Sequence, residues 1–210
     1  MNLENIGSRH GTDKVYHGYM KFYESYFGKI RNEEIKLMEI GVYKGSSIKT
    51  WEEYFPKGLI FGIDDSTLVE KSTLLNFTMG RIKTFMADQK NRKQLESVIS
   101  DIKDLDIIID DGLHYQEHQQ VSLGFLFKFL KNKGLYIIED LCPRIYTVGT
   151  WGIRDVSEIT TNILENFCSN KKISSPYMTP EEMHYLEEHI ESINLHYISN
   201  ESIIAFIRKK

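Results

Sequence analysis

Short apolar runs alternate with amphipathic stretches along most of the chain. The apolar runs are four to eight residues long and rich in branched side chains, which is typical of buried strands. We expect strands at 36–42, 59–64, 81–87, 105–110 and 134–140. Amphipathic helices are expected at 46–55, near 91–100, from after the fourth strand to about Leu130, and at 155–169. The pattern therefore predicts repeated strand-then-helix units.

Such units are joined by right-handed crossovers and form parallel sheets. Two further apolar runs, 191–198 and 201–209, are separated only by a turn at Ser199-Asn200, so they should pair antiparallel. The predicted fold is α/β: a Rossmann-like, doubly wound and mostly parallel seven-stranded sheet with a closing antiparallel hairpin.

Three further segments complete the expected single domain, residues 1–210. Residues 19–27 carry aromatic side chains at helical spacing and should pack on the sheet, within an N-terminal helical cap that covers 1–30. Residues 179–189 read as a charged helix. The segment 142–155 combines Gly, Trp and Arg with little periodicity, so we expect either a lid over the site or an ordinary crossover loop.

The composition excludes several classes of protein. With 41% hydrophobic and 27% charged residues, the chain can form an ordinary core and is not disordered. Its formal charge of −4, with both signs interspersed, argues against a nucleic-acid partner. Cys142 and Cys168 match no metal-binding spacing and suggest a reducing compartment. With neither a signal-like start nor a run of about 18 apolar residues, we expect a cytoplasmic protein without a transmembrane segment.

The candidate chemistry follows the strands, because ligands of open α/β sheets bind at the carboxyl ends of the strands. After the first strand, "MEIGVYKGSS" places Glu39, Gly41 and Gly45 in an E-x-G-x-x-x-G pattern that differs from the dinucleotide fingerprint G-x-G-x-x-G. Asp64 ends the second strand, where a carboxylate can accept hydrogen bonds from ribose hydroxyls. Asp88 and Gln89 follow the third strand, either as turn residues or as contacts to an adenine.

This order of groups resembles the class I S-adenosylmethionine-dependent methyltransferases. The resemblance implies that Glu39, Gly41, Gly45 and Ser46 line the amino-acid part of the methyl donor, that Asp64 binds its ribose, and that Asp88 and Gln89 lie near its adenine. In the N-terminal "TDKVYHGY", Lys14 would reach the donor's carboxylate while His17 and Tyr19 close over it, unless Thr12 or Asp13 simply caps a helix.

Four carboxylates end the fourth and fifth strands. These strands should be neighbours, about 4.8 Å apart, which brings Asp110 and Asp111 close to Glu139 and Asp140. A hard divalent cation would relieve the repulsion, and oxygen ligands favour Mg²⁺ or Ca²⁺, with Mn²⁺ as a further choice. We expect Asp111, Glu139 and Asp140 to bind the metal, while Asp110 alternates to the other face, towards the donor.

The motif "DDGLH", with "ED" 28 residues after its second aspartate, and the opening "GTDKVYHGY" resemble the metal-dependent sugar O-methyltransferases of macrolide biosynthesis. That resemblance implies that Asp111, Glu139 and Asp140 hold the metal and that His114 is the catalytic base. His118, one helical turn further on, is expected to support the site. Members of that family also carry a sizeable N-terminal auxiliary domain that these 210 residues do not contain, so the oligomeric state stays open, a homo-oligomer included.

The sequence therefore predicts an O-methyltransferase that uses S-adenosylmethionine and Mg²⁺ (or Mn²⁺) to methylate a sugar hydroxyl. The acceptor could be a nucleotide sugar, a glycan or a glycosylated metabolite. Three alternatives remain: a catechol-type phenol O-methyltransferase, a nicotinamide-dependent oxidoreductase, and a non-catalytic subunit of a glycan-building complex. The missing G-x-G-x-x-G argues against the oxidoreductase.

Overall fold

The computed structural model describes the chain except residues 1, 66, 68–73, 75–76, 142–152 and 199–201. Three sequence expectations fall largely on the excluded residues: the lid at 142–155, the thiol of Cys142 and the turn at Ser199-Asn200. They lie outside the described residues, apart from positions 153–155, and stay predictions.

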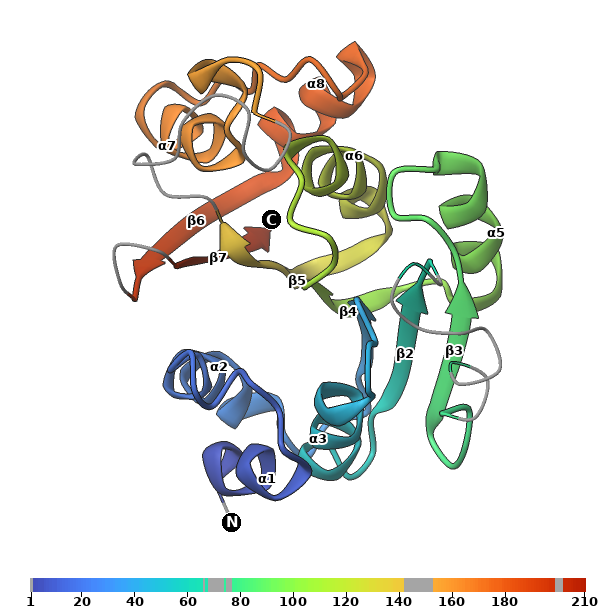
Figure 1. Cartoon of the computed structure of the whole chain (residues 1–210). Helices are drawn as coiled ribbons and strands as arrows, with labels where there is room; N and C mark the ends of the chain where they lie inside the picture. Colours follow the sequence, from blue (N-terminus) through green and yellow to red (C-terminus); the bar gives the residue numbers. More distant parts are fainter. Residues whose placement is uncertain (1, 66, 68–73, 75–76, 142–152, 199–201) are drawn as a thin grey trace.

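A seven-stranded sheet forms the centre of the molecule (Figure 1). Its strands are β1 (Lys36–Ile40), β2 (Leu59–Asp64), β3 (Ile82–Met86), β4 (Leu105–Asp110), β5 (Leu130–Leu141), β6 (Ile190–Tyr197) and β7 (Ile203–Lys209). They are arranged in the order β3-β2-β1-β4-β5-β7-β6. The first five are parallel, whereas β7 is antiparallel to both β5 and β6. This confirms the predicted fold class, including the closing hairpin and the pairing of the fourth strand with the fifth.

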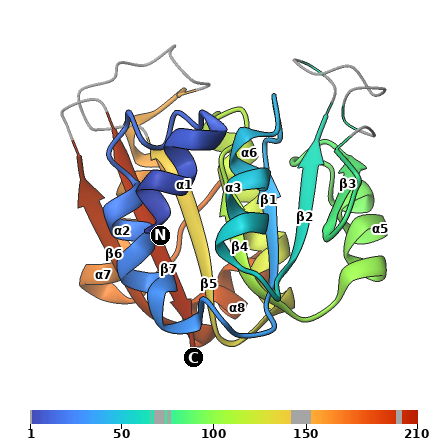
Figure 2. The same ribbon diagram turned by 90° about the horizontal axis from the view of Figure 1, so that it is seen from below.

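Helices cover both faces of this sheet. One layer holds α1 (Leu3–His10), α2 (Met20–Phe27) and α3 (Ser46–Tyr54), which lie in front of the sheet in Figure 2. The other layer holds α5 (Arg92–Ile102), α6 (Gln116–Leu126), α7 (Thr160–Asn170) and α8 (Pro180–His189). Short 3₁₀ turns occur at Gly28–Ile30, Phe127–Phe129 and Val156–Glu158.

Two hydrophobic cores result from the alternation of side chains along the strands. In β4, Ile107 and Ile109 point to the core under α1, α2 and α3, whereas Ile108 joins the core under α5 to α8. The same alternation continues to the ends of the strands, where it decides which polar side chains share a face. It thereby sets the positions of the acids described below.

The predicted element boundaries differ from the observed ones at helix ends and at the start of β5. α6 ends at Leu126 and β5 begins at Leu130, so the expectations of a helix to about Leu130 and a strand from 134 were wrong at these ends. The helix expected at 46–55 begins at Ser46 with Gly45 in a left-handed conformation (φ 76°) as its N-cap, and neither serine makes a side-chain cap. The helix expected at 155–169 is divided into a 3₁₀ turn and α7. Among the described residues, no helix has both the length and the apolar character needed to cross a bilayer.

The carboxyl ends of β1, β4 and β5 are level with one another. Ile40 pairs with Asp110, and Asp110 pairs with Ile138. Beyond Ile138 the pairing of β5 with β7 shifts register before it resumes at Leu141, so Glu139 and Asp140 occupy an irregular turn of the strand. Bulges of this kind redirect side chains next to functional sites. Residues following these three strands therefore converge on one rim of the sheet.

Candidate active site

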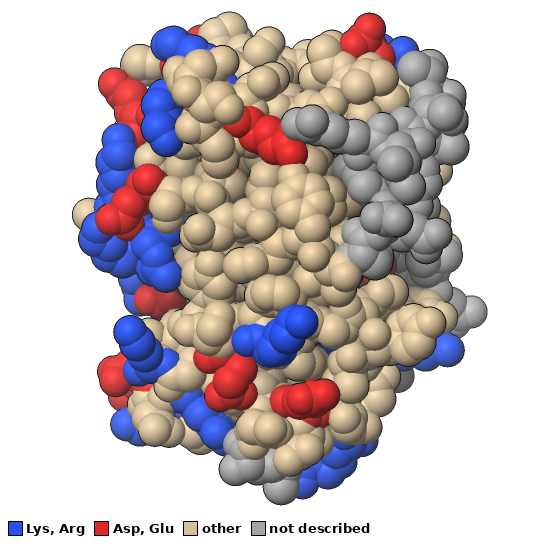
Figure 3. Space-filling view, turned by 90° about the vertical axis from the view of Figure 1, so that its left-hand side faces the viewer, with Lys and Arg blue, Asp and Glu red and all other residues tan. Residues whose placement is uncertain are grey.

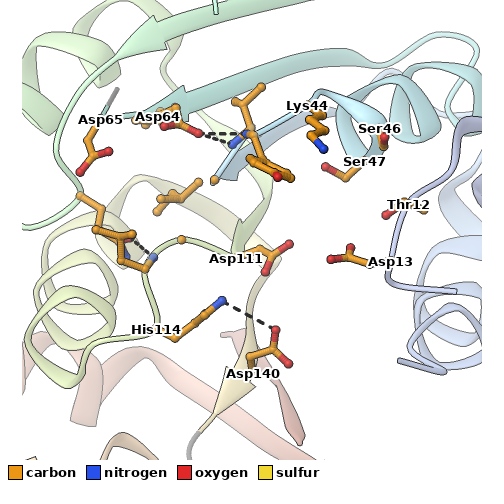
Figure 4. A pocket seen from close by; sticks show the side chains of 18 of the residues that line it. Thr12, Asp13, Lys44, Ser46, Ser47, Asp64, Asp65, Asp111, His114 and Asp140 are labelled. Carbon is orange, nitrogen blue, oxygen red and sulfur yellow. Dashed lines mark hydrogen bonds and ion pairs between the residues drawn. The ribbon is translucent and has the colours of Figure 1, made fainter. Parts of the chain in front are cut away.

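A cavity of about 500 Å³ opens at this rim (Figure 4). Of the residues that the sequence assigned to a site, those lining the cavity are Gly41, Ser46, Asp64, Gln89, Asp111, His114 and Asp140. Candidates for donor binding and candidates for metal binding and catalysis thus share one space. The cavity is also lined by Thr12, Asp13, Lys44 and Asp65, which the sequence did not assign to a ligand.

Gly41 and Gly112 allow two loops to approach each other at the floor of the cavity. A Cβ built on Gly41, whose φ is +92°, would lie 2.0 Å from the carbonyl oxygen of Asp111. A Cβ on Gly112 would lie 1.9 Å from Oε1 of Gln89. A larger residue at Gly41 would force the loops after β1 and β4 apart, so this glycine is required by close packing, whereas a larger residue at Gly112 would displace the end of the Gln89 side chain.

Asp64 organises the loop after β1. Its Oδ2 accepts hydrogen bonds from the backbone N–H groups of Val42 (2.9 Å) and Tyr43 (3.0 Å). Because one carboxylate oxygen carries both bonds, the other is left to face the cavity, where Asp64 appears in Figure 4. The side chain therefore holds the loop in shape and still offers an acceptor to a ligand.

The residues expected near an adenine have different environments. Gln89 is buried and lines the cavity, its Oε1 accepting a hydrogen bond from the N–H of Leu113 at 3.1 Å. Its Nε2 donates to Oδ1 of Asp110 at 3.0 Å. Asp88 accepts a bond from the N–H of Lys90, as a turn residue does. An adenine contact is thus better supported for Gln89 than for Asp88.

Asp110 is buried on the α6 side of the sheet and does not line the cavity. Besides Gln89, it accepts hydrogen bonds from the hydroxyls of Ser122 and Tyr136. Burial raises the pKa of the Asp110 carboxyl group, against the lowering effect of the hydrogen bonds from Ser122 and Gln89. As predicted, the side chain of Asp110 lies on the opposite face of the sheet from that of Asp111. Its link to the cavity is the hydrogen bond from Gln89, which lines the cavity.

Three acids gather on the opposite face, under α1, α2 and α3. They are Glu39, Asp111 and Glu139, which follow or end the neighbouring strands β1, β4 and β5. The buried ammonium group of Lys14 lies among them, 3.3 Å from Glu39 Oε1 and 2.8 Å from Glu139 Oε1, and it also contacts Asp111. Ser47 donates a further bond of 2.7 Å to Glu39.

This charge arrangement perturbs all of its members. Burial raises the pKa of Glu39 and of Glu139, although the neighbouring Lys14 opposes the change. Burial by itself would lower the pKa of Lys14, but Asp111, Glu139 and Glu39 outweigh it and the pKa is raised well above its usual value. The surrounding acids therefore favour the charged form of Lys14. Its predicted contact with the donor's carboxylate stays a prediction.

The N-terminal segment also holds the acids of β5 through two tyrosines. The hydroxyl of Tyr23 donates to Glu139, and that of Tyr19 donates to Asp140 and contacts Ser202 of the closing hairpin. His17 stacks on Tyr19 with a ring-centroid distance of 5.5 Å. His17 and Tyr19 were expected to close over the donor. In the structure Tyr19 contacts Asp140 of the site directly, and His17 contacts Tyr19.

Asp111, His114 and Asp140 form the part of the site that faces the cavity. Their ligand atoms all lie within 4.8 Å of one another, and His114 Nε2 is 3.8 Å from Asp140 Oδ2 (Figure 4). His114 (φ 57°) and Asp140 (φ 47°) both have left-handed backbone conformations, which are uncommon outside glycine. Local strain of this kind is concentrated at functional sites.

The donor set suits a hard divalent cation. Asp111 and Asp140 present carboxylate oxygens that are partly exposed to the cavity, as Mg²⁺ requires when it keeps water and substrate ligands. Glu139, the third predicted ligand, is buried and engaged by Lys14 and Tyr23. His118, expected to support the site, lines a separate cavity beside α6.

Known proteins with similar sequences are antibiotic-sugar methyltransferases, although no family model matches the chain. The mycinamicin VI 2''-O-methyltransferase of Micromonospora griseorubida is 30% identical over 99% of this chain and 52% of its own length. The 8-demethyl-8-(2-methoxy-alpha-L-rhamnosyl)-tetracenomycin-C 3'-O-methyltransferase of Streptomyces olivaceus is 35% identical over 68% of this chain and 38% of its own. The chain is a homologue of the macrolide-sugar O-methyltransferases.

Solved structures agree with this relationship. The MycE methyltransferase of the mycinamycin biosynthetic pathway, in complex with Mg, SAH and mycinamycin VI, matches all of this chain with a TM-score of 0.79 and 26% sequence identity. The match covers 54% of the MycE chain, so this homologue spans about half of the length of its relatives. The resemblance to the macrolide-sugar O-methyltransferases, expected from "DDGLH", "ED" and "GTDKVYHGY", is thereby confirmed for the chain as a whole.

Proposed function

We propose that the chain acts as an S-adenosylmethionine-dependent, divalent-metal-assisted O-methyltransferase on a sugar hydroxyl. One observation carries the proposal: Asp64, expected at the donor's ribose, lines the same cavity as Asp111, His114 and Asp140. Methyl transfer needs the donor and the deprotonated acceptor side by side, which only a shared cavity allows. The relatives named above support the same reaction class.

The donor would lie across the carboxyl ends of β1 and β2. Gly41 lets it approach the backbone, and Ser46 lies at the N-terminus of α3. Asp64 would accept hydrogen bonds from the ribose with the oxygen that the loop does not use. Gln89 would border the adenine, held there by Leu113 and Asp110. Glu39 does not line the cavity, and its proposed role is to position Ser47, which lines the cavity and donates a hydrogen bond to Glu39.

Asp111, Glu139 and Asp140 are the proposed metal ligands, with Asp111 and Asp140 facing the acceptor. When bound, Mg²⁺ would orient the acceptor and lower the pKa of its hydroxyl group. Lys14 would favour the ionised forms of Asp111 and Glu139, against the effect of burial, and would hold both carboxylates in place, because its ammonium group contacts both. Tyr19 would hold Asp140 in place through its hydrogen bond.

His114 would remove the acceptor's proton. Its Nε2 is 3.8 Å from Asp140 Oδ2, and the ring offers a nitrogen within 4.8 Å of ligand atoms on both aspartates, so an acceptor oxygen at the metal site would also be near the imidazole. As the proton moves to the ring, the oxygen forms a bond to the donor's methyl carbon, and the carbon–sulfur bond breaks with its electron pair staying on sulfur. The products are the methyl ether and S-adenosylhomocysteine.

Transfer of labelled methyl from S-adenosylmethionine to a panel of sugars, nucleotide sugars and catechols, with Mg²⁺ present, tests the proposal. Label in a sugar product supports it. Label only in catechols would favour the phenol methyltransferase, and tight donor binding without transfer to any acceptor would favour the non-catalytic subunit. A thermal shift with a nicotinamide cofactor and none with S-adenosylmethionine would favour the oxidoreductase.

Self-association is a further part of the proposal. Figure 3 shows a face on the β6 side of the molecule whose centre carries few Lys, Arg, Asp or Glu residues. β6 is the edge strand of the sheet there. Such a face suits a homo-oligomer better than a nucleic acid, which would need basic side chains. A cytoplasmic location stays a prediction.

A further inference from the structure

The turn after β4 carries two of the groups proposed for the reaction. It spans residues 111–114, between the end of β4 and the start of α6, and includes the proposed metal ligand Asp111 and the proposed base His114. Since these residues belong to neither the strand nor the helix, other contacts must fix their shape. The position of the base depends on those contacts.

The backbone at His114 needs such support. Its φ of 57° is a left-handed conformation, which residues with a side chain rarely adopt. Conformations of this kind persist only where the surrounding contacts enforce them. The direction of the imidazole follows from this backbone, so a change in the contacts would move the ring.

Two backbone N–H groups of the turn are held from outside it. The N–H of Asp111 donates to the carbonyl oxygen of Ile40 at 3.0 Å, at the end of β1. The N–H of Leu113, directly before His114, donates to Oε1 of Gln89 at 3.1 Å. The acceptor of the second bond is a side chain of the loop after β3, so this bond can be removed by substitution without changing the sheet.

Gln89 also packs against this turn. Its side chain is buried, and a Cβ built on Gly112 would lie 1.9 Å from Oε1 and 2.8 Å from Cδ of Gln89. The amide group of Gln89 thus fills the space that a side chain at position 112 would occupy. Packing and the hydrogen bond to Leu113 together make Gln89 a direct support of the turn.

Asp110 determines which way the Gln89 amide points. Nε2 of Gln89 donates to Oδ1 of Asp110 at 3.0 Å. An ionised carboxylate can only accept and a backbone N–H can only donate, so the amide fits between Asp110 and Leu113 in one orientation. The acid is held in turn by the buried hydroxyl groups of Ser122 on α6 and Tyr136 on β5. The support of the turn is therefore anchored in the core of the protein.

We infer that Gln89, oriented by Asp110, is a positioning residue for the turn that carries the base His114. The inference rests on the proposed methyltransferase and adds a second role to the adenine contact proposed for Gln89. Gln89 and His114 line the same cavity. A donor bound against Gln89 would therefore contact the same side chain that holds the base in place.

Steady-state kinetics of Gln89→Leu separates the positioning role from donor binding. The substitution removes both hydrogen bonds of the amide, and kcat at saturating donor should fall by about tenfold or more, because a small displacement of a catalytic group is costly in rate. Gln94→Leu is the matched control, since Gln94 also accepts a bond from a backbone N–H, that of Asp88, but at an exposed position on α5. It should leave kcat unchanged. A raised KM for the donor with the parent's kcat in Gln89→Leu would confine Gln89 to donor binding and overturn the inference.

A double variant that exchanges the two side-chain types provides the rescue. In Gln89→Glu combined with Asp110→Asn, the amide at position 110 can donate to the carboxylate at position 89, which still accepts from the N–H of Leu113. The net charge of the pair stays that of the parent. We expect the kcat of the double variant to be well above that of Gln89→Leu. An equally low kcat in both variants would contradict the positioning role.

The NMR signals of the His114 ring give a readout that needs no turnover. In histidine-labelled protein these signals, identified by their loss in His114→Ala, should move in Gln89→Leu and return towards the parent's in the double variant. The signals of His184, which is exposed on α8, should stay in place. Unchanged His114 signals in Gln89→Leu would overturn the inference, even in a protein that transfers methyl groups. Moved signals, with no methyl transfer by the parent to any acceptor, would refute the proposed enzyme and keep the contact that positions His114.

Discussion

The ammonium group of Lys14 lies 2.8 Å from Oε1 of Glu139, with both side chains almost completely buried. The residues come from opposite parts of the chain, and their contact joins the segment after α1 to the end of β5. Because Glu139 is also a proposed metal ligand, the same carboxylate would contribute to stability through Lys14 and to the proposed reaction through the metal.

Replacing Lys14 should destabilise the protein in a metal-dependent way. Lys14→Met leaves Glu39, Asp111 and Glu139 without their shared cation, and breaking a buried ion pair by removing one partner costs about 3–5 kcal/mol. We expect a lower melting temperature than the parent's, and a larger rise on adding Mg²⁺, since the metal would then supply the missing charge. Differential scanning calorimetry with and without Mg²⁺ measures both.

Lys29→Met, at an exposed position after α2, is the matched control and should change neither quantity. If Lys14→Met had the parent's stability, or gained no more from Mg²⁺ than Lys29→Met does, Lys14 would not be the counter-charge of this cluster.

The donor site can be tested at Asp64. Asp64→Ala removes the acceptor proposed for the ribose and should weaken S-adenosylmethionine binding by about 1.5–3 kcal/mol, the usual range for hydrogen bonds to a charged group. It also frees the N–H groups of Val42 and Tyr43, so Asp64→Asn, which keeps an acceptor oxygen for them, separates the two effects. Unchanged affinity of Asp64→Ala in calorimetry would remove Asp64 from the donor site.

Turnover should depend on His114. His114→Ala is expected to keep donor and metal binding and to lose about 10² or more in kcat, as is typical for loss of a general base. His10→Ala, which removes a histidine paired with Glu53 on the surface, should leave kcat unchanged. Normal turnover of His114→Ala would leave a carboxylate or water as the base.

The metal requirement can be measured directly. A chelator should abolish activity and Mg²⁺ or Mn²⁺ should restore it, with Asp140→Asn needing much more metal than the parent because it removes a ligand charge. Asp101→Asn, at an exposed site away from the cavity, should titrate like the parent. Full turnover in excess chelator would exclude a metal role for Asp111 and Asp140.

The stability of the protein should decrease in mild acid, in part through His118. Burial lowers the pKa of this ring in the folded state relative to its value of about 6.5 in an unfolded chain. Protons therefore bind the unfolded chain more readily, and stability that is present above that value is lost as the pH falls towards the folded-state pKa. His118→Gln should lose less stability between neutral and mildly acidic pH, measured by chemical denaturation. An equal loss in both proteins would argue against this assignment.

The strands were predictable because their sequence pattern is local. β4 was expected at 105–110 and is observed at Leu105–Asp110. A short continuous run of branched apolar residues is typical of a strand that is buried on both faces. Helix starts were harder to predict. The start of α3 depends on Gly45 adopting φ 76°, a conformation that composition permits but does not require.

The site was predictable up to the point where distant segments meet. Strand ends placed Asp64, Asp111 and Asp140 correctly at one rim, because parallel strands bring their carboxyl ends together. The position of Lys14 among Glu39, Asp111 and Glu139 depends on how the N-terminal segment packs against the sheet, which no local pattern encodes. Asp13, which also lines the cavity, was expected to cap a helix at most, because its place in the site depends on the same packing.

The left-handed backbone at His114 and Asp140 has an evolutionary consequence. At these two positions the fold alone would prefer glycine or asparagine, because other residues pay roughly 1–2 kcal/mol for that conformation. The backbone geometry therefore requires neither side chain, and glycine would be the least strained residue at both positions. A glycine at either position of a related sequence would mark a site that has lost the imidazole or the carboxylate.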